Sequence, residues 1–350
     1  MKSSAQNSNS TPPGRRRRSR FRTGALVLAL SLSLPAAEFS VRLISPQEYT
    51  FPRWKFSPQY GHELYPSVKM VHARPGSYRL VYTINEYGCR GRPVPVAETY
   101  DAPNIVVLGD SYSFGHGVND GEEYPAVMAR ELEGGYSVIN LGVGGWGLTQ
   151  HIRRYYEFGA LYDPRVIVLQ FCGNDPSDNL VNSVATISGG RFSFHDAGIE
   201  INLAKKYLSR SVIQKSQLYN LMVHNLYPLL EQRWIQVKAR NIAPKDAPEE
   251  KIPVAEKYYI ELLELFAQDL SSNHKKLIMI SLNGNLDGFP HIRHKVMELD
   301  AAGLLKYCEV THWLDGRTGY QAPDGHIWGS KAHQVIGGKL AEAVKGLDKQ

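Results

Sequence analysis

The sequence predicts an α/β protein: a three-layer α/β/α sandwich around a mainly parallel sheet. From Asn104 onward, short strands that are apolar throughout alternate with longer helical segments. Strands of this kind are buried on both faces, as in a parallel sheet that is covered by helices. A length of 350 residues with ordinary apolar, Gly and Pro content is enough for one large domain or two average ones.

The N-terminus has the pattern of an export signal. A polar leader and an arginine run precede GALVLALSLSLPAA, 14 uncharged residues at positions 24–37, and a positive region before an apolar one is typical of such signals. The apolar stretch is shorter than the about 20 residues of a full membrane span. No good cleavage site follows, so an uncleaved anchor that continues past Glu38 toward Leu43 is the alternative. We predict that residues 1–43 are a cytoplasmic basic tail plus a signal peptide or membrane anchor, with the rest extracytoplasmic, in the periplasm or on the cell surface.

The positive charge of the chain is concentrated in this tail. The formal net charge is +6, but seven of the 40 basic residues precede residue 23, where no acid offsets them. The remainder has 33 basic and 34 acidic side chains. A nucleic-acid-binding domain needs a basic face on its folded part, so the expected partner is the inner membrane and not nucleic acid.

Residues 44–103 are rich in Pro, Tyr and Arg and are expected to form an N-terminal elaboration of the main domain. Within them, residues 78–84 alternate, with Tyr78, Leu80, Tyr82 and Ile84 on one face. This period of two predicts a half-buried strand.

The main domain is expected over residues 104–350. The predicted strands cover residues 105–109, 136–142, 165–173 and 275–284. The predicted helices cover residues 122–134, 148–159, 256–270 and 291–303, and a last helix begins near Ser330. An insertion at about 184–253 contains a hairpin-like piece and an amphipathic stretch at 216–240, which is expected to pack onto the domain, with a lid over the site as the alternative.

The residues that follow the strands are the candidates for function, because ligands bind beyond the carboxyl ends of parallel strands. Each candidate alone is also ordinary cap or turn chemistry. The segments are Gly109-Asp110-Ser111, Asn140-Leu141-Gly142 and Gly173-Asn174-Asp175, with Asp324 and His326 before the last helix.

Together these residues supply every part that acyl transfer requires. Ser111 is a weak nucleophile until a base takes its proton, and His326 is suited to that task near neutral pH. Asp324 is expected to accept from the other ring nitrogen, and His333 is the fallback base. The candidate donors to the oxyanion are the backbone N–H of Ser111, that of Gly142 and the side-chain amide of Asn174.

These blocks, in this order, resemble the SGNH (GDSL) hydrolase superfamily, and in particular bacterial members with an N-terminal membrane signal. The resemblance covers roughly residues 104–344, and NEYGCRG at residues 85–91 is similar to a segment that those proteins place before the first block. It implies the SGNH hydrolase fold, with a flavodoxin-like sheet, and gives Ser111 the role of nucleophile, Gly142 and Asn174 that of oxyanion donors and His326 that of base. The family usually spaces its acid and base as Asp-x-x-His, whereas this chain has Asp324-Gly325-His326.

The sequence therefore predicts a serine esterase that cleaves a carboxylic ester without a metal or cofactor. Its location and the family analogy favour an O-acyl group, such as acetyl, on an envelope carbohydrate. Two alternatives remain: an O-acyltransferase that uses the same site, and a non-catalytic envelope-binding module on this fold. The three cysteines allow at most one disulfide, and Cys172 is expected to be a buried, inert thiol.

Overall fold

The structure, a computed structural model, describes residues 13–91, 103–197, 213–223, 252–282, 284–314 and 319–347, together with Asn225, Arg233 and Val237. Its centre is a five-stranded sheet with the strand order β12-β11-β8-β6-β7, in which every pair is parallel. In chain order this is the 2-1-3-4-5 arrangement of flavodoxin-like sheets. The strands are β6 (Asn104–Leu108), β7 (Ser137–Asn140), β8 (Val166–Phe171), β11 (Lys276–Ser281) and β12 (Lys306–Cys308).

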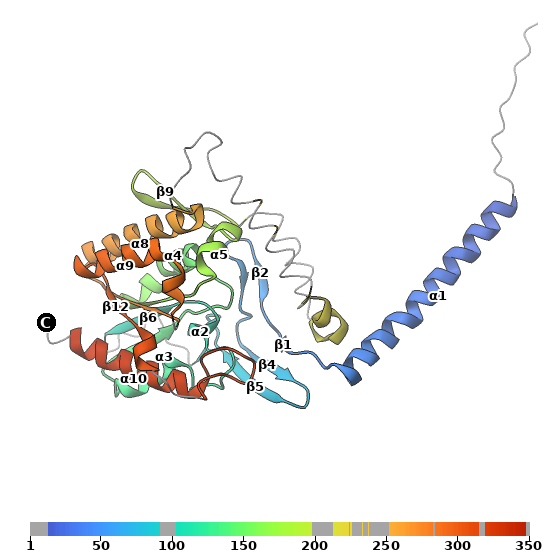
Figure 1. Ribbon diagram of the computed structural model, residues 1–350, viewed down its shortest axis with the longest axis horizontal. Coiled ribbons are helices and arrows are strands. Elements are labelled where there is room, and N and C mark those ends of the chain that lie inside the picture. The colour runs from blue at the N-terminus through green and yellow to red at the C-terminus, as the bar shows by residue number, and fades with distance from the viewer. Residues whose placement is uncertain are drawn as a thin grey trace, which may run out of the picture.

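Helices cover both faces of this sheet (Figure 1). One face packs against α4 (Leu148–Glu157), α8 (Val254–Ser272) and α9 (Pro290–Ala301) in a buried apolar cluster. The other packs against α3 (Tyr124–Glu131) and α10 (Ser330–Leu347) in a second cluster. Alternate residues of each strand point into the two clusters, as Ile105 and Val106 do, so the predicted three-layer fold is confirmed.

The predicted strands and helices of the main domain are present within a few residues of their expected bounds. The edge strand β12 was not predicted, because Lys306, Tyr307 and Cys308 do not form an apolar run. The short helices α2 (Ser111–Phe114) and α5 (Asp175–Val181) follow β6 and β8. The 3₁₀ helices are η1 (Gly159–Tyr162), η2 (Ile213–Lys215), η3 (Asn285–Gly288) and η4 (Val310–Trp313).

The insertion begins with an antiparallel hairpin of β9 (Ala185–Ser188) and β10 (Arg191–Phe194), as expected. Residues 217–223 are helical, and most of the predicted amphipathic stretch after them lies outside the described residues. Cys89, Cys172 and Cys308 are buried and free, so they form no disulfide.

The N-terminal region forms two small antiparallel sheets. One contains β1 (Tyr49–Phe51), β4 (Val68–Arg74) and β5 (Tyr78–Ile84), and the other is a hairpin of β2 (Lys55–Ser57) and β3 (Gly61–Glu63). The predicted strand at residues 78–84 is therefore confirmed. Its inward face packs with Phe114, the last residue of α2, and with Val143 and Trp146 on the loop that follows β7. This region thus contacts the edge of the main sheet where the site is expected.

Helix α1 (Pro13–Ile44) extends away from the rest of the chain (Figure 1). Its segment Arg22–Ile44 has a mean hydropathy of 1.6 and is long and apolar enough to cross a membrane, and its most apolar window is 0% buried. A signal sequence meets the same criteria.

Candidate active site

Ser111 lies just beyond the carboxyl end of β6, at the first residue of α2. Asp110 caps this helix, and its carboxylate accepts a hydrogen bond from the N–H of Tyr112 at 3.0 Å. The turn requires glycine at position 109, because a Cβ there would lie 2.1 Å from Ser113 Oγ. The local sequence thus fixes the Ser111 hydroxyl at the half-exposed edge of the sheet.

Asp324 and His326 lie on the loop before α10, and the structure brings them to Ser111. His326 Nε2 is 3.3 Å from Ser111 Oγ, and Nδ1 is 3.0 Å from Asp324 Oδ2. The other carboxylate oxygen accepts the backbone N–H of His326 at 3.0 Å. Gly325 between them has φ +98°, in the left-handed region. This turn lets an Asp-x-His spacing place acid and base side by side.

Asp324 and His326 shift each other's pKa values in opposite directions. Burial alone would raise the pKa of Asp324, whose side chain is 1% exposed, but the hydrogen bond and charge of His326 hold it below its usual value. Burial alone would lower the pKa of His326, but Asp324 outweighs it and raises it. The imidazole is thus a stronger base than a free histidine.

The three candidate oxyanion donors differ in whether they already have a hydrogen-bond partner. Among the described residues, the N–H of Ser111 has no hydrogen-bond partner, as expected for the first turn of a helix. The N–H of Gly142 instead donates to Asn140 Oδ1 at 3.0 Å. The amide of Asn174 donates to Asp178 Oδ2 at 2.5 Å, which leaves its second amide hydrogen available.

Gly142, which the sequence predicts as an oxyanion donor, also serves the packing of the site. A Cβ at this position would lie 2.5 Å from the backbone nitrogen of Phe114, so glycine is required for close contact with α2. Gly144 is the glycine beside the nucleophile, where a Cβ would lie 3.6 Å from that of Ser111. Within the described part of the chain, the N–H groups of Gly144 and Gly145 have no partner.

His333, the fallback base, is a structural residue. Its side chain is 0% exposed in the contact between α10 and α3. Its Nδ1 accepts the backbone N–H of Tyr124 at 3.1 Å, and burial lowers the pKa of its ring to about 3. It does not reach Ser111 and is neutral at physiological pH.

Arg90, from the NEYGCRG segment, fixes the loop that follows the nucleophile. Its buried guanidinium donates to the carbonyls of Phe114 at 2.9 Å and Val118 at 2.7 Å, and also to that of Gly115. It is further paired with Asp120 at 3.2 Å. Sequence reasoning noted the segment but gave Arg90 no role, because its partners are backbone atoms that no motif displays.

A cluster of polar side chains that was not predicted surrounds Asp324. His116 Nε2 lies 3.8 Å, and His72 Nδ1 3.9 Å, from Asp324 Oδ2. His72 belongs to β4 of the N-terminal sheet, and its Nε2 is 2.7 Å from Glu48 Oε1. Glu48, His72 and His116 offer ligand atoms within 4.8 Å of one another and are a candidate set for holding a metal ion.

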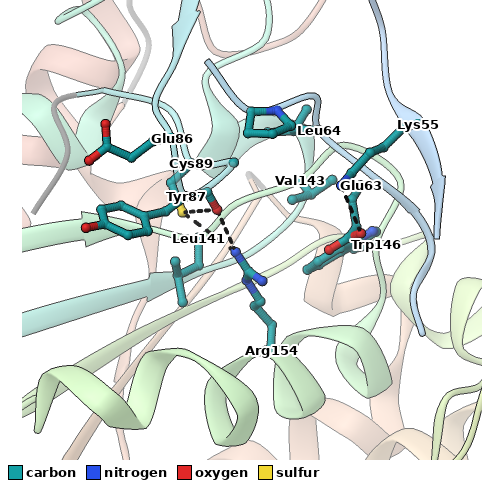
Figure 2. Close-up of a pocket in the computed structure, with 12 residues that line it drawn as sticks. Lys55, Glu63, Leu64, Glu86, Tyr87, Cys89, Leu141, Val143, Trp146 and Arg154 are labelled. Atoms are coloured by element: carbon teal, nitrogen blue, oxygen red, sulfur yellow. Dashed lines mark hydrogen bonds and ion pairs between the residues drawn. The ribbon is translucent and has the colours of Figure 1, made fainter. Parts of the chain in front are cut away.

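A partly open cavity in the described part of the chain lies away from Ser111. It has a volume of about 150 Å³ and is lined by the β2–β3 hairpin, residues 86–89 and the loop after β7. Figure 2 shows Arg154 of α4 pointing into it, where its guanidinium donates to the carbonyl of Tyr87 at 3.1 Å. No residue of the Ser111–His326–Asp324 set lines this cavity.

Comparison with known proteins gives the family to which this arrangement is similar. Residues 107–221 match the model of the GDSL-like Lipase/Acylhydrolase family. No curated protein matches the sequence significantly.

Solved structures that resemble the chain include three bacterial proteins. A lipolytic protein of the G-D-S-L family from Desulfitobacterium hafniense shares 11% identity over 68% of this chain and 98% of that one, with a TM-score of 0.41. A GDSL-like lipase from Bacteroides thetaiotaomicron shares 11% identity over 70% and 88%, with a TM-score of 0.36. Est24, a carbohydrate acetylesterase from Sinorhizobium meliloti, shares 9% identity over 70% and 99%, with a TM-score of 0.39.

Proposed function

We propose that the chain is a serine hydrolase acting on esters, in keeping with the match of residues 107–221 to the GDSL-like Lipase/Acylhydrolase family, and that Ser111, His326 and Asp324 are its catalytic triad. The observation that supports this assignment is the continuous contact from the Ser111 hydroxyl through the imidazole to a buried carboxylate. This contact joins the end of β6 to a loop more than 200 residues later in the chain.

The proposed reaction begins when His326 Nε2 takes the proton of Ser111 as Oγ attacks the ester carbonyl. Asp324 holds the Nδ1–H tautomer and stabilises the imidazolium that forms. When the tetrahedral intermediate collapses, the C–O bond of the ester breaks and the proton on Nε2 passes to the departing alcohol oxygen. A water molecule, deprotonated by the same nitrogen, then hydrolyses the acyl-enzyme and restores Ser111.

The oxyanion that develops in both steps needs donors near Ser111. The free N–H of Ser111 is one, and we assign a second to the Gly144–Gly145 turn, whose N–H groups are unengaged among the described residues. Asn174 is the third, through the amide hydrogen that Asp178 does not use or after rotation away from it. Donors placed in this way stabilise the charge of the transition state more than they stabilise the bound ester.

For the substrate, we propose an O-acylated carbohydrate of the cell envelope. Support comes from the expected location: the arginine run precedes the apolar segment of α1, and this order favours a hydrolase domain outside the cytoplasm. The catalytic groups fit any carboxylic ester, so they support the reaction but do not select the substrate. The class of substrate is supported by the expected location alone.

We further propose that α1 remains attached as an anchor. Glu38 near its end accepts the backbone N–H groups of Gln217 at 2.9 Å and Leu218 at 2.8 Å, and the hydroxyl of Ser216 at 2.7 Å. Glu38 therefore caps the helix at residues 217–223 of the insertion. Residues from Glu38 onward then belong to the folded domain, and residues 44–103 and 104–350 form the extracytoplasmic part.

The test of the proposed function is turnover of nitrophenyl esters by the purified full chain in detergent. Acetyl, butyryl and octanoyl esters report the acyl preference, and Ser111→Ala serves as the inert control. A sugar acceptor included in parallel reports transfer in place of hydrolysis. Equal turnover by wild type and Ser111→Ala would refute the assignment.

A further inference from the structure

A chain of hydrogen bonds links the N-terminal sheet to the loop that follows Ser111. The N–H of Gly117 donates to Tyr82 Oη at 3.0 Å, and Tyr82 Oη is 2.5 Å from His72 Nδ1. On the far side of the ring, His72 Nε2 is 2.7 Å from Glu48 Oε1. A neutral His72 with its proton on Nε2 satisfies all three bonds at once, because Tyr82 then donates to Nδ1 and His72 donates to Glu48.

The middle of this chain is shielded from water, whereas the side chain of Glu48 is 31% exposed. The side chains of Tyr82 and His72 are 0% exposed. Burial would raise the pKa of Glu48, but its hydrogen bonds with His72 and Tyr78 hold it below its usual value. Glu48 is thus a charged acceptor at neutral pH. It accepts the proton on Nε2 of His72, which leaves Nδ1 of His72 to accept from Tyr82.

The other end of the chain rests against the proposed catalytic carboxylate. A Cβ at Gly117 would lie only 2.6 Å from Asp324 Oδ1, so the backbone of this residue directly backs the carboxylate. His116 stacks on His72 with ring centroids 4.2 Å apart and lies 5.0 Å from the ring of His326. Burial holds the pKa of His116 well below its usual value, so this ring stays neutral. Asp324 is thus enclosed by groups that the N-terminal sheet holds in place.

We propose that Tyr82 and His72 are positioning residues that hold residues 115–118, and through them Asp324, in the geometry that pairs the acid with His326. The inference rests on the proposed function, because it concerns the same triad. In this way the sheet of β1, β4 and β5 contributes to the geometry of the hydrolase site.

The geometry favours this hydrogen-bonded arrangement over a metal site. The rings of His72 and His116 are stacked with an interplanar angle of 30°. The lone pairs of an imidazole lie in the plane of its ring, so two stacked rings do not direct them at one ion. Both ring nitrogens of His72 also have close oxygen partners already.

The test compares Tyr82→Phe and Tyr60→Phe in the full chain. Each change removes one hydroxyl from a buried tyrosine of the N-terminal region, but Tyr60 donates to Glu157 of α4, away from the triad. Tyr82→Phe should lower kcat about tenfold or more, with little change in KM, because a small displacement of a catalytic group has a large effect on rate. Tyr60→Phe should lower Tm without changing kcat.

A second readout separates positioning from general loss of structure. The pKa of His326, followed by NMR with labelled histidine, should fall in Tyr82→Phe and His72→Phe, because weaker pairing with Asp324 no longer raises it. Glu48→Gln keeps an acceptor for His72 but removes a charge that itself raises the pKa of His326, so it should lower that pKa less than Tyr82→Phe and His72→Phe do. The charged or titratable groups that face His326 are Asp324, Asp110, Glu48, His72, His116 and Tyr112.

These measurements distinguish the inference from the proposed function. If Tyr82→Phe and His72→Phe lower Tm as Tyr60→Phe does, but leave both kcat and the pKa of His326 unchanged, the positioning role is refuted. If Zn²⁺ binds the wild type and His72→Phe abolishes that binding, the cluster is a metal site and the inference is overturned. If the wild type has no esterase activity, the proposed function fails, and the NMR comparison still decides whether the sheet positions Asp324.

Discussion

Replacing Gly117 with alanine tests the geometry of the proposed acid most sharply. A Cβ at this position would lie 2.6 Å from Asp324 Oδ1 and 2.7 Å from the Cβ of Ala322. Both neighbours are buried, so the carboxylate has to move by several tenths of an ångström to reach ordinary contact. A misplacement of about 1 Å at a reacting group costs on the order of 10² in rate. We therefore expect Gly117→Ala to lower kcat by about 10- to 100-fold.

The matched control is Gly121→Ala in the same loop region. Gly117 has φ +89° and Gly121 has φ +84°, so both changes place alanine in the left-handed region, at a similar cost of about 1–2 kcal/mol in stability. At Gly121 the nearest atom to the new Cβ is Arg130 Nη1 at 3.9 Å, and the change should leave kcat near the wild-type value.

The assay is turnover of nitrophenyl acetate at saturating ester, with Tm measured by calorimetry for both variants. The unfavourable backbone conformation of alanine should lower the Tm of both variants. The contact with Asp324 should lower kcat only in Gly117→Ala. Equal kcat values for the two variants would show that Asp324 tolerates displacement, which would refute its role in orienting His326.

Three further predictions concern the other site residues. Activity should fall as the pH decreases through the pKa of His326, because only the neutral ring accepts a proton, and this pKa is raised above the usual value of about 6.5. Asp324→Asn should move this fall in activity to lower pH, and a fall at the wild-type pH would contradict the pairing of Asp324 with His326. Asn174→Ala should lower kcat by about 10²–10³ with a smaller effect on KM; an unchanged rate would mean that the amide of Asn174 only bonds Asp178 and shapes the turn after β8. His333→Ala should lower Tm through the lost contact with Tyr124 but leave the acid limb in place, and a dead, well-folded variant would show that His333 is the base.

Local patterns determined much of the fold. The strands β6, β8 and β11 are buried on both faces, and their apolar runs are visible in the sequence. The edge strand β12 has three residues, one of them an exposed lysine, so its assignment depends on pairing with β11, which no local pattern reveals.

The sequence predicted the site best where a residue directly follows a strand or precedes the last helix. Ser111 and Asn174 were predicted from the strand ends, and Asp324 and His326 from their place before α10 and from the chemistry that Ser111 requires. The glycine that faces Ser111 was not, because several glycines follow β7 and only the path of the turn, with Gly145 at φ +76°, decides which one approaches the nucleophile. His72 was missed because its contact with Asp324 depends on how the N-terminal sheet packs against the main domain, and Arg90 because its partners are mainly backbone carbonyls.

The central claim is that Ser111 is the nucleophile of a serine hydrolase. The most direct test is mass spectrometry of the full chain after treatment with a fluorophosphonate, which forms a stable covalent bond with an activated serine. We expect a single adduct on Ser111, absent in Ser111→Ala and much slower to form in His326→Ala, with the nearby Ser113 unmodified. An adduct on another serine, or esterase activity that persists in Ser111→Ala, would contradict the central claim.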